Sequence, residues 1–432
     1  MQVLGQSCCQ VVDAVAHRNY TDKPTMARRL QQETTINSTT STSEYSDEPM
    51  SNKPMSDEAV KVSSHAQQDA MAQQTGAPTE LPRAASGNAV QWMVLLGAFI
   101  VALTLAATLG APVPLSDLWS HDAARAEVAQ RIFWRFGGEW GLRPVRLLAG
   151  ALVGASLATS GAALQAVFRN PLAEPYLLGI SAGGALGAAV GVALQGSTSL
   201  RVLDNSLFDV SSVLAFGGAV AASSLVYVLG QRGNNGASAG AFAGASNRGG
   251  LLLTGVAVSS FLAALMALVV ALSNRADLAQ QIMFWMLGGL TRATSAQNAV
   301  LFVSFVAGLG TLLWSARDLN ALRAGDEEAM SLGVPVVALH RRLLLAAALM
   351  SAAAVATAGL IGFVGLLAPH LIRLLFGSNA RAMIPAAAVG GATLLVSCDA
   401  LARSVVQPVE LPVGIITALL GVPLFLFLAR RS

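Results

Sequence analysis

Gly359-Leu-Ile-Gly-Phe-Val-Gly-Leu-Leu-Ala-Pro-His-Leu-Ile-Arg373 is the stretch of sequence that decides the fold of this chain. It is apolar enough for the interior of a bilayer, yet it ends with a proline, a histidine and an arginine. Proline removes a hydrogen bond from a helix, and His370 and Arg373, three residues apart, share a helical face. Polar groups within a membrane are costly, so the stretch is predicted to be the functional end of a transmembrane helix.

The composition of the whole chain points to the same class of protein. Of its 432 residues, 54% are hydrophobic and 12% are charged. A soluble domain carries about 25% charged residues, so the composition predicts an all-α polytopic membrane protein. The net charge of +3 is small and no basic–aromatic pattern is present, so nothing indicates a nucleic-acid partner.

The polarity of the chain changes sharply near residue 88. Residues 1–88 are rich in polar residues and contain neither apolar periodicity nor the hydrophobic region of a signal peptide. They are predicted to form a disordered tail, followed by a transmembrane domain over 89–432. A start codon assigned too far upstream would explain the tail equally well. Cys398, in an apolar span, is expected to pack as a small hydrophobic residue.

Ten apolar segments follow the tail, each close to the ~20 residues that a helix needs to cross ~30 Å of hydrocarbon. The seventh and eighth are joined by almost no loop, so their boundary is the hardest to place. The predicted spans are 91–111, 146–167, 177–195, 211–230, 251–272, 297–315, 342–358, 360–376, 385–402 and 411–429.

Two blocks of sequence resemble each other. Ala158-Thr-Ser-Gly161 and Ala356-Thr-Ala-Gly359 are each followed, ten residues later, by a proline. Five spans separate the two blocks, so they would face opposite ways across the membrane. This predicts an inverted repeat, a common plan among transporters. Chance matches between small residues in Ala-rich helices are the alternative explanation.

A second unusual stretch is Glu410-Leu-Pro-Val-Gly-Ile-Ile-Thr-Ala-Leu-Leu-Gly-Val-Pro-Leu-Phe425. Together with the Gly359–Arg373 stretch, it resembles the membrane subunits of ABC importers for iron–siderophores, haem and vitamin B12, the FecCD-like permease family. The resemblance covers residues 91–432 and implies a vitamin B12 importer permease-like fold in the bacterial inner membrane, with both termini cytoplasmic. It departs at the tail and at the insert Gln231–Gly250, which is predicted to be a flexible loop.

The polar segment 317–335, between the sixth and seventh spans, carries the strongest functional signal. Asp318 can cap a short helix that ends at Gly325, and Asp326 favours the start of a second. The pair is similar to the coupling helices that bind the ATP-binding subunit of an ABC transporter; a solvated loop is the plain alternative. The residues assigned to this contact are Leu319, Leu322, Ala329 and Leu332 for packing, Arg323, Glu327 and Glu328 for polar contacts, and Gly333 for the end of the second helix.

ATP hydrolysis is expected on a different chain. A phosphate-binding loop needs a lysine, and the only lysines are Lys23, Lys53 and Lys61, all in the tail. No cofactor and no enzymatic activity are therefore predicted for this chain, and ATP and Mg²⁺ belong to the partner subunit. The sequence offers no convincing cluster of metal ligands.

Three arginines are predicted at the outer membrane surface: Arg143 and Arg146 at the start of the second span, and Arg403 at the end of the ninth. In the family, arginines at the matching places meet glutamates of a periplasmic or surface substrate-binding protein, and such charges steer docking. Contact with lipid phosphate is the alternative. Asp399 can also neutralise Arg403 as its i, i+4 partner.

The resemblance implies a path between two copies of the subunit, either a homodimer or a pair with a close paralogue. Thr254 and Gly255 are assigned to its gate. Gln165, Asn170 and Glu174 are assigned to its inner mouth, although the capping of helix ends explains these three side chains equally well.

The predicted function is the permease subunit of a binding-protein-dependent ABC importer for an iron chelate, with a ferric siderophore first and cobalamin or haem as alternatives. An ion-coupled secondary transporter is the competing hypothesis. It would need a carboxylate near mid-membrane, and the predicted spans contain only Asp399, near an end. A membrane enzyme would need a cluster of reactive groups, and His370 has no evident catalytic partner.

Overall fold

The structure is a computed structural model of the 432-residue chain. It describes residues 86–108, 122, 142–195, 209–232, 243–273, 275–406 and 409–429. The tail predicted over 1–88 lies outside the described residues, except for the last three positions, which begin the first helix.

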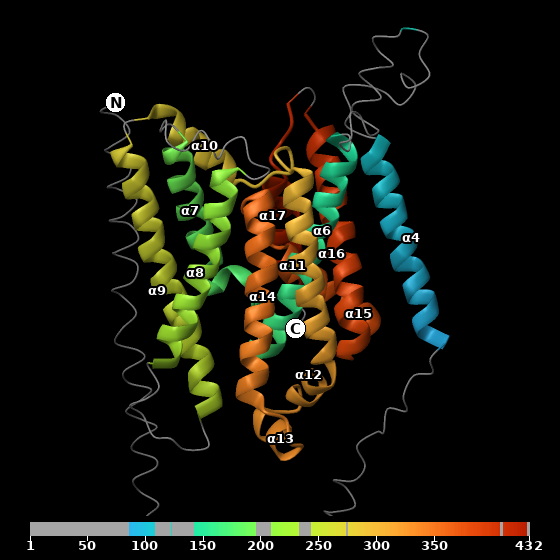
Figure 1. Ribbon diagram of the computed structural model, residues 1–432. Coiled ribbons are helices and arrows are strands. Elements are labelled where there is room, and N and C mark those ends of the chain that lie inside the picture. The colour runs from blue at the N-terminus through green and yellow to red at the C-terminus, as the bar shows by residue number, and fades with distance from the viewer. Residues whose placement is uncertain are drawn as a thin grey trace, which may run out of the picture. The chain divides into compact units, whose positions relative to one another are not determined.

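The described residues form a bundle of helices (Figure 1). Seven of them are long and apolar enough to cross a membrane, and three shorter apolar helices accompany them. Each of the ten predicted spans corresponds to one of these helices. In chain order the elements are α4 (Ser86–Thr108), α6 (Leu142–Phe168), the 3₁₀ turn η2 (Pro175–Leu178), α7 (Ile180–Leu194), α8 (Val210–Arg232), α9 (Ala243–Leu272), α10 (Ala276–Met286), α11 (Ser295–Trp314), α12 (Ala316–Leu322), α13 (Asp326–Ser331), α14 (Val336–Ala358), α15 (Val364–Phe376), α16 (Ala380–Ser404) and α17 (Val413–Ala429).

Two segments differ from the sequence prediction. The insert Gln231–Gly250 is not a loop throughout, because α9 already begins at Ala243 and α8 continues to Arg232; residues 233–242 lie outside the described residues. Helix α10 was not predicted. It is short, and Asp277 and two glutamines interrupt its apolar residues, so it gives no signal of a membrane span.

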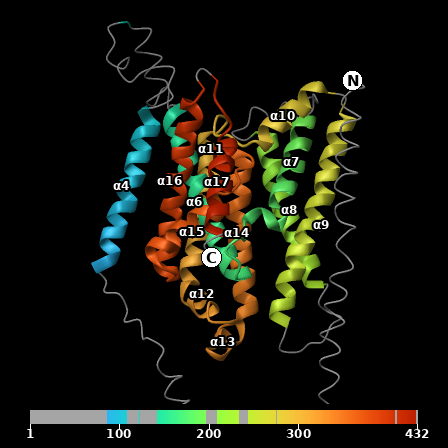
Figure 2. The same ribbon diagram turned by 180° about the vertical axis from the view of Figure 1, so that it is seen from behind.

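Helices α6, α14 and α16 form the centre of the bundle, with α7, α8 and α9 on one side and α4 on the other (Figure 1 and, from behind, Figure 2). Small residues let the backbones meet. A Cβ atom on Gly154 would lie 2.3 Å from the carbonyl oxygen of Gly391, and one on Gly183 would lie 2.3 Å from that of Gly218. Cys398 is 1% exposed in this core, which confirms its role as a small packed residue.

A sharp break separates α14 from α15. Gly359 ends α14 with a φ of +70°, which glycine adopts without strain. The Tyr176 hydroxyl then accepts a hydrogen bond from the Ile361 N–H and donates one to the Ile361 carbonyl, both at 2.8 Å. Phe363 has a φ of +68°, rare for a bulky residue, and its N–H donates to Glu174 Oε1 at 2.7 Å. Glu174 therefore caps α15 and fixes the break.

Pro369 lies inside α15, within the predicted span 360–376, and Arg373 lies in the last turn of this helix. Because proline has no N–H, the carbonyl of Gly365, four residues earlier, loses its helical donor. The side-chain amide of Gln165 on α6 compensates, with Nε2 3.3 Å from the Leu366 oxygen and 3.5 Å from the Gly365 oxygen. The amide oxygen accepts a hydrogen bond from Arg373 at 3.0 Å. The proline is tolerated because α6 supplies the missing donor.

Helices α12 and α13 lie at one end of the bundle and α10 lies at the other (Figure 1). Only Ser315 separates α11 from α12, so α12 begins at Ala316 and Asp318 lies in its first turn. This corrects the prediction that Asp318 caps the helix. Gly325 precedes α13, as predicted for the end of the first short helix, and Gly333 follows α13 with a φ of +81°.

Candidate functional site

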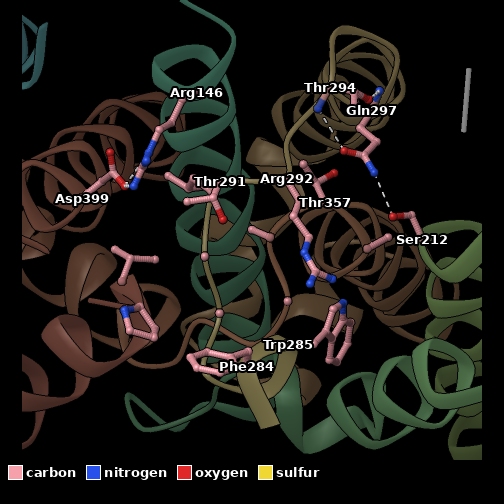
Figure 3. Close-up of a pocket in the computed structure, with 18 of the residues that line it drawn as sticks. Arg146, Ser212, Phe284, Trp285, Thr291, Arg292, Thr294, Gln297, Thr357 and Asp399 are labelled. Carbon is pink, nitrogen blue, oxygen red and sulfur yellow. Dashed lines mark hydrogen bonds and ion pairs between the residues drawn. The ribbon is translucent and has the colours of Figure 1, made fainter. Parts of the chain in front are cut away.

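The end of the bundle opposite α12 and α13 contains a pocket of about 400 Å³ (Figure 3). Its walls are the end of α10 and the loop after it, the start of α11, the break after α14, and the segment between α16 and α17. One end of α11 and one end of α14 lie at the pocket, and the other end of each helix connects to the α12–α13 pair. The two helices therefore join two distant surfaces.

The pocket has a mixed apolar and polar lining. Phe284 and Trp285 come from α10, whereas Thr291 and Arg292 come from the loop after it (Figure 3). Arg292 is exposed, and within the described residues it has no ion pair. Such a lining suits a ligand that combines apolar surface with negative or hydrogen-bonding groups.

A capping box builds the wall at the start of α11. The Thr294 hydroxyl accepts from the Gln297 N–H at 3.2 Å, and the Gln297 side chain accepts from the Thr294 N–H at 3.0 Å. Gln297 also donates to the Ser212 hydroxyl at 2.8 Å, which ties α11 to α8. Sequence reasoning missed this wall, although the Thr-x-x-Gln spacing is a readable signal. Arg292 carries no such signal.

Four charged side chains form a network beside the pocket, and three of them, Arg146, Asp399 and Glu410, line it. Asp399 accepts from Arg146 at 2.9 Å and from Arg403 at 3.1 Å, and Glu410 accepts from Arg146 at 2.8 Å. The side chains of Asp399 and Arg403 are only 3% and 4% exposed. Two cations and two anions balance one another, which is the condition under which charges can be buried. The predicted i, i+4 pairing of Asp399 with Arg403 is confirmed.

The three predicted docking arginines lie at this end but turn inward. Arg143 is 8% exposed and donates to the Ala107 carbonyl, and Arg403 donates to the Ala106 carbonyl at 2.9 Å. These carbonyls belong to the last turn of α4, where no helical donor remains, so they attract cations. Arg143 and Arg403 are therefore buried and not exposed at the predicted outer surface. Arg146 keeps 16% of its side chain exposed, and docking to a binding protein stays a prediction.

The residues assigned to the coupling contact fall into two groups. Leu319, Leu322 and Ala329 are no more than 3% exposed, so they attach α12 and α13 to the bundle itself. Leu332, by contrast, is 70% exposed and remains available to another molecule. The three polar residues of the group, Arg323, Glu327 and Glu328, are exposed, and so is the turn residue Gly333.

An arginine of α6 also holds this pair of helices. Arg169 donates to the Asp326 carboxylate at 2.8 Å and to the Leu322 carbonyl at 2.9 Å. It thereby joins the end of α12 and the start of α13 to the transmembrane bundle.

The predicted gate residues have separate surroundings. A Cβ atom on Gly255 would lie 2.0 Å from the Leu177 oxygen, so α9 packs directly against η2. Thr254, the neighbouring residue on α9, is partly exposed. Asn170 accepts from the Leu172 N–H at 2.9 Å and shapes a turn, whereas Gln165 joins α6 to α15. Each of these contacts is structural, and a role in gating stays a prediction.

Burial controls the ionisation of the groups around the break. It raises the pKa of Glu174, and the hydrogen bond from the Phe363 N–H lowers it in part. Burial, followed by the charge of Glu174, raises the pKa of Tyr176. At the exposed start of α10, in contrast, the hydrogen bond from Arg275 lowers the pKa of Asp277. Among the described residues, no group of three or more His, Cys, Asp or Glu side chains could hold a metal ion.

Comparisons with known proteins agree with this architecture. The sequence profile of the FecCD transport family matches residues 88–431. A hemin transport system permease of Yersinia pestis is 38% identical over 79% of this chain and 97% of its own length. A cobalamin import system permease of Halobacterium salinarum is 39% identical over 67% of this chain and 72% of its own length. A solved structure of a proposed metal-chelate type ABC transporter, in an inward-facing conformation, matches with a TM-score of 0.62 and 28% identity over 79% of this chain and all of that one. This chain therefore belongs to the FecCD transport family.

Proposed function

We propose that this chain is the permease subunit of an ATP-driven, binding-protein-dependent importer that carries an iron chelate across the bacterial inner membrane. Membership of a family of transport subunits supports a role in transport and not in catalysis. The observation that carries the proposal is the α12–α13 pair, a short projection held firmly between two transmembrane helices.

The attachment of this pair suits the transmission of movement. Helix α12 follows α11 without a loop, buried side chains fix both short helices, and Arg169 joins them to α6. Leu332 and Met330 are 70% and 52% exposed, beside the exposed Glu327 and Glu328. An ATP-binding subunit that engages this surface would move α11 and α14, whose other ends line the pocket. Under this proposal α12, α13 and the start of α4, which lies at the same end of the bundle (Figure 1), would face the cytoplasm.

A second copy of the chain, or a close paralogue, would complete the path. In a single copy of the chain, only 11% of the most apolar part of α9 is buried. Its side chains Leu253, Phe261 and Leu272 are each more than 60% exposed. Burial of part of this surface against a second subunit would be favourable, whereas lipid would cover the rest. The pocket at the opposite end would then be one half of an outer entrance, where a substrate-binding protein delivers the cargo.

The cargo we propose is a ferric siderophore, with haem as the second candidate. Arg292 and the aromatic wall of the pocket suit a large chelate with acidic groups. The alignment that supports haem covers 97% of the hemin transport permease, a larger share than that of the cobalamin permease. An Fe(3+)-citrate permease of Bacillus subtilis is also similar, at 37% identity over 67% of this chain.

Uptake by spheroplasts with and without this gene tests the proposal. Labelled ferric hydroxamate, haem and cobalamin would be supplied separately, together with the binding protein. We expect the loss of one cargo on deletion of the gene, and the same loss on depletion of ATP. Uptake should persist when an uncoupler is added while ATP is maintained.

The buried carboxylate of Glu174 sharpens this test. An ion-coupled carrier would need a buried carboxylate. Glu174 has one, although the sequence analysis put this residue between two predicted spans and not within one. In the structure it is bound to the backbone N–H of Phe363, which favours a capping role. Loss of uptake under uncoupler with ATP intact would contradict the ATP-driven mechanism and favour ion coupling.

A further inference from the structure

A second pocket, of about 280 Å³, lies beside the α12–α13 pair. Its walls come from α6, α12, α15 and the start of α16, and three arginines contribute to them: Arg169, Arg323 and Arg373. None of the described residues that line it is acidic. A cavity between membrane helices that is lined by several cations and no anion is a basic pocket of the kind that binds lipid headgroups.

The charges of two of these arginines are not neutralised within the described chain. Arg323 donates to the Ser378 carbonyl at 2.6 Å, and Arg373 donates to the Gln165 side chain at 3.0 Å, but neither pairs with a carboxylate. Their positive charges act on each other. Arg169 does have an acidic partner, Asp326. The pocket thus holds an excess of positive charge next to the membrane.

We propose that this pocket binds a phosphate group, supplied by the headgroup of an acidic phospholipid. Each guanidinium has five N–H donors in a planar fork that matches phosphate oxygens, and the hydrogen bonds above leave most of them unused. The small side chains of Ala162, Ala163 and Ala166 line the same space and leave room for the ligand. Leu374 and Leu375, next to Arg373 in the chain, are 67% and 53% exposed, so apolar surface for acyl chains lies close by.

A bound phosphate would connect α12 to the membrane helices. Arg323 lies directly after α12 and Arg373 lies in the last turn of α15, so one anion held by both would join these elements. The position of the α12–α13 pair would then depend on the lipid. This inference concerns binding to the isolated chain and does not depend on the cargo or on an ATP-binding subunit.

Thermal unfolding of the purified chain in neutral detergent tests the proposal. The probes are phosphatidylglycerol, phosphatidylcholine and inorganic phosphate, each titrated separately. The variants are Arg323→Gln, Arg373→Gln and the double variant. Arg381→Gln is the matched control, because Arg381 is an exposed arginine at the start of α16 that does not line the pocket.

Phosphatidylglycerol should raise the melting temperature of the wild type in a saturable way, and phosphatidylcholine should not. Each Arg→Gln change should raise the half-saturating concentration about tenfold, as expected for the loss of one charged hydrogen bond. Arg323→Lys should keep part of the affinity, and Arg381→Gln should keep all of it. Saturable stabilisation by inorganic phosphate that the double variant loses would identify a soluble phosphate ligand as the source. An equal effect of phosphatidylglycerol on the double variant and the wild type would overturn the proposal.

Discussion

Two groups of charged residues, one at each end of this bundle, differ in how they are paired. At the pocket end, Arg146 and Arg403 both bind Asp399, and all three side chains are mostly buried. At the α12–α13 end, Arg323 and Glu328 are exposed and have no ion pair among the described residues. Mutually paired charges shape a wall, whereas unpaired charges remain available to a ligand or partner. The same residue types therefore have a structural role in the buried network, whereas Arg323 and Glu328 remain available for an interaction.

The largest effect is expected at the centre of the buried network. Asp399→Ala would leave Arg146 without its buried partner and Arg403 without its i, i+4 partner. Removing one member of a buried ion pair destabilises a protein by about 3–5 kcal/mol. Chemical or thermal unfolding in detergent would measure this loss. Glu410→Gln is the matched control, because its side chain is 41% exposed and its pair with Arg146 should contribute about 1 kcal/mol or less. Equal effects of the two changes would break the contrast between paired and exposed charges.

Glu174 should show the next largest effect. Glu174→Ala leaves the Phe363 N–H without its acceptor, at a cost of about 1–3 kcal/mol. Glu174→Gln keeps an acceptor oxygen and removes the buried charge. The pKa of Glu174 is raised by burial, so the wild type loses stability as the pH rises above the pKa of the unfolded chain.

The glutamine variant should therefore gain stability relative to the wild type between acidic and neutral pH. Melting temperatures of both proteins across this range would measure the difference. If the stability advantage of the glutamine variant over the wild type grew as the pH fell, the buried-charge explanation would be contradicted.

A smaller effect is expected at the turn after α13. Gly333 has a φ of +81° and open space around it, so Gly333→Ala meets no clash and introduces only backbone strain. The strain should lower the free energy of unfolding by about 1–2 kcal/mol. Gly310→Ala in α11 is the control, since it also meets no atom within 4 Å but has an ordinary helical backbone. Its stability should rise by about 0.5–1 kcal/mol.

The smallest effect on stability, and a large effect on transport, is expected for Glu328→Lys. This exposed residue should change the free energy of unfolding by about 0.5 kcal/mol or less. If the α12–α13 pair binds the ATP-binding subunit, the same change should uncouple ATP hydrolysis from uptake in proteoliposomes. Unchanged ATP-driven uptake would show that this surface is solvated and does not bind the ATP-binding subunit.

Much of the fold could be predicted because membrane helices leave a local signal. All ten apolar spans correspond to helices, and the two short helices of the 317–335 segment follow from their acidic and glycine residues. Helix α10 was missed because it is short and interrupted by polar residues.

The candidate site was less accessible from sequence, since its contacts join distant parts of the chain. The bond between Asp399 and Arg403 was predictable from their spacing of four residues. Arg146 binds the same carboxylate although it lies 253 residues from Asp399 in the sequence, and no local sequence pattern predicts that contact. The burial of Arg143 also depends on the end of α4, another separate segment.

The burial of Cys398 has a practical consequence for spectroscopy. This thiol is 1% exposed, so a water-soluble maleimide should not reach it in the folded protein. A chain with Cys8→Ser and Cys9→Ser would then present no reactive thiol in its folded state. Cysteines introduced at Thr291, on the pocket, and at Met330, on α13, could carry a pair of fluorescent or spin labels. The distance between those labels would report directly whether the two ends of the protein move together.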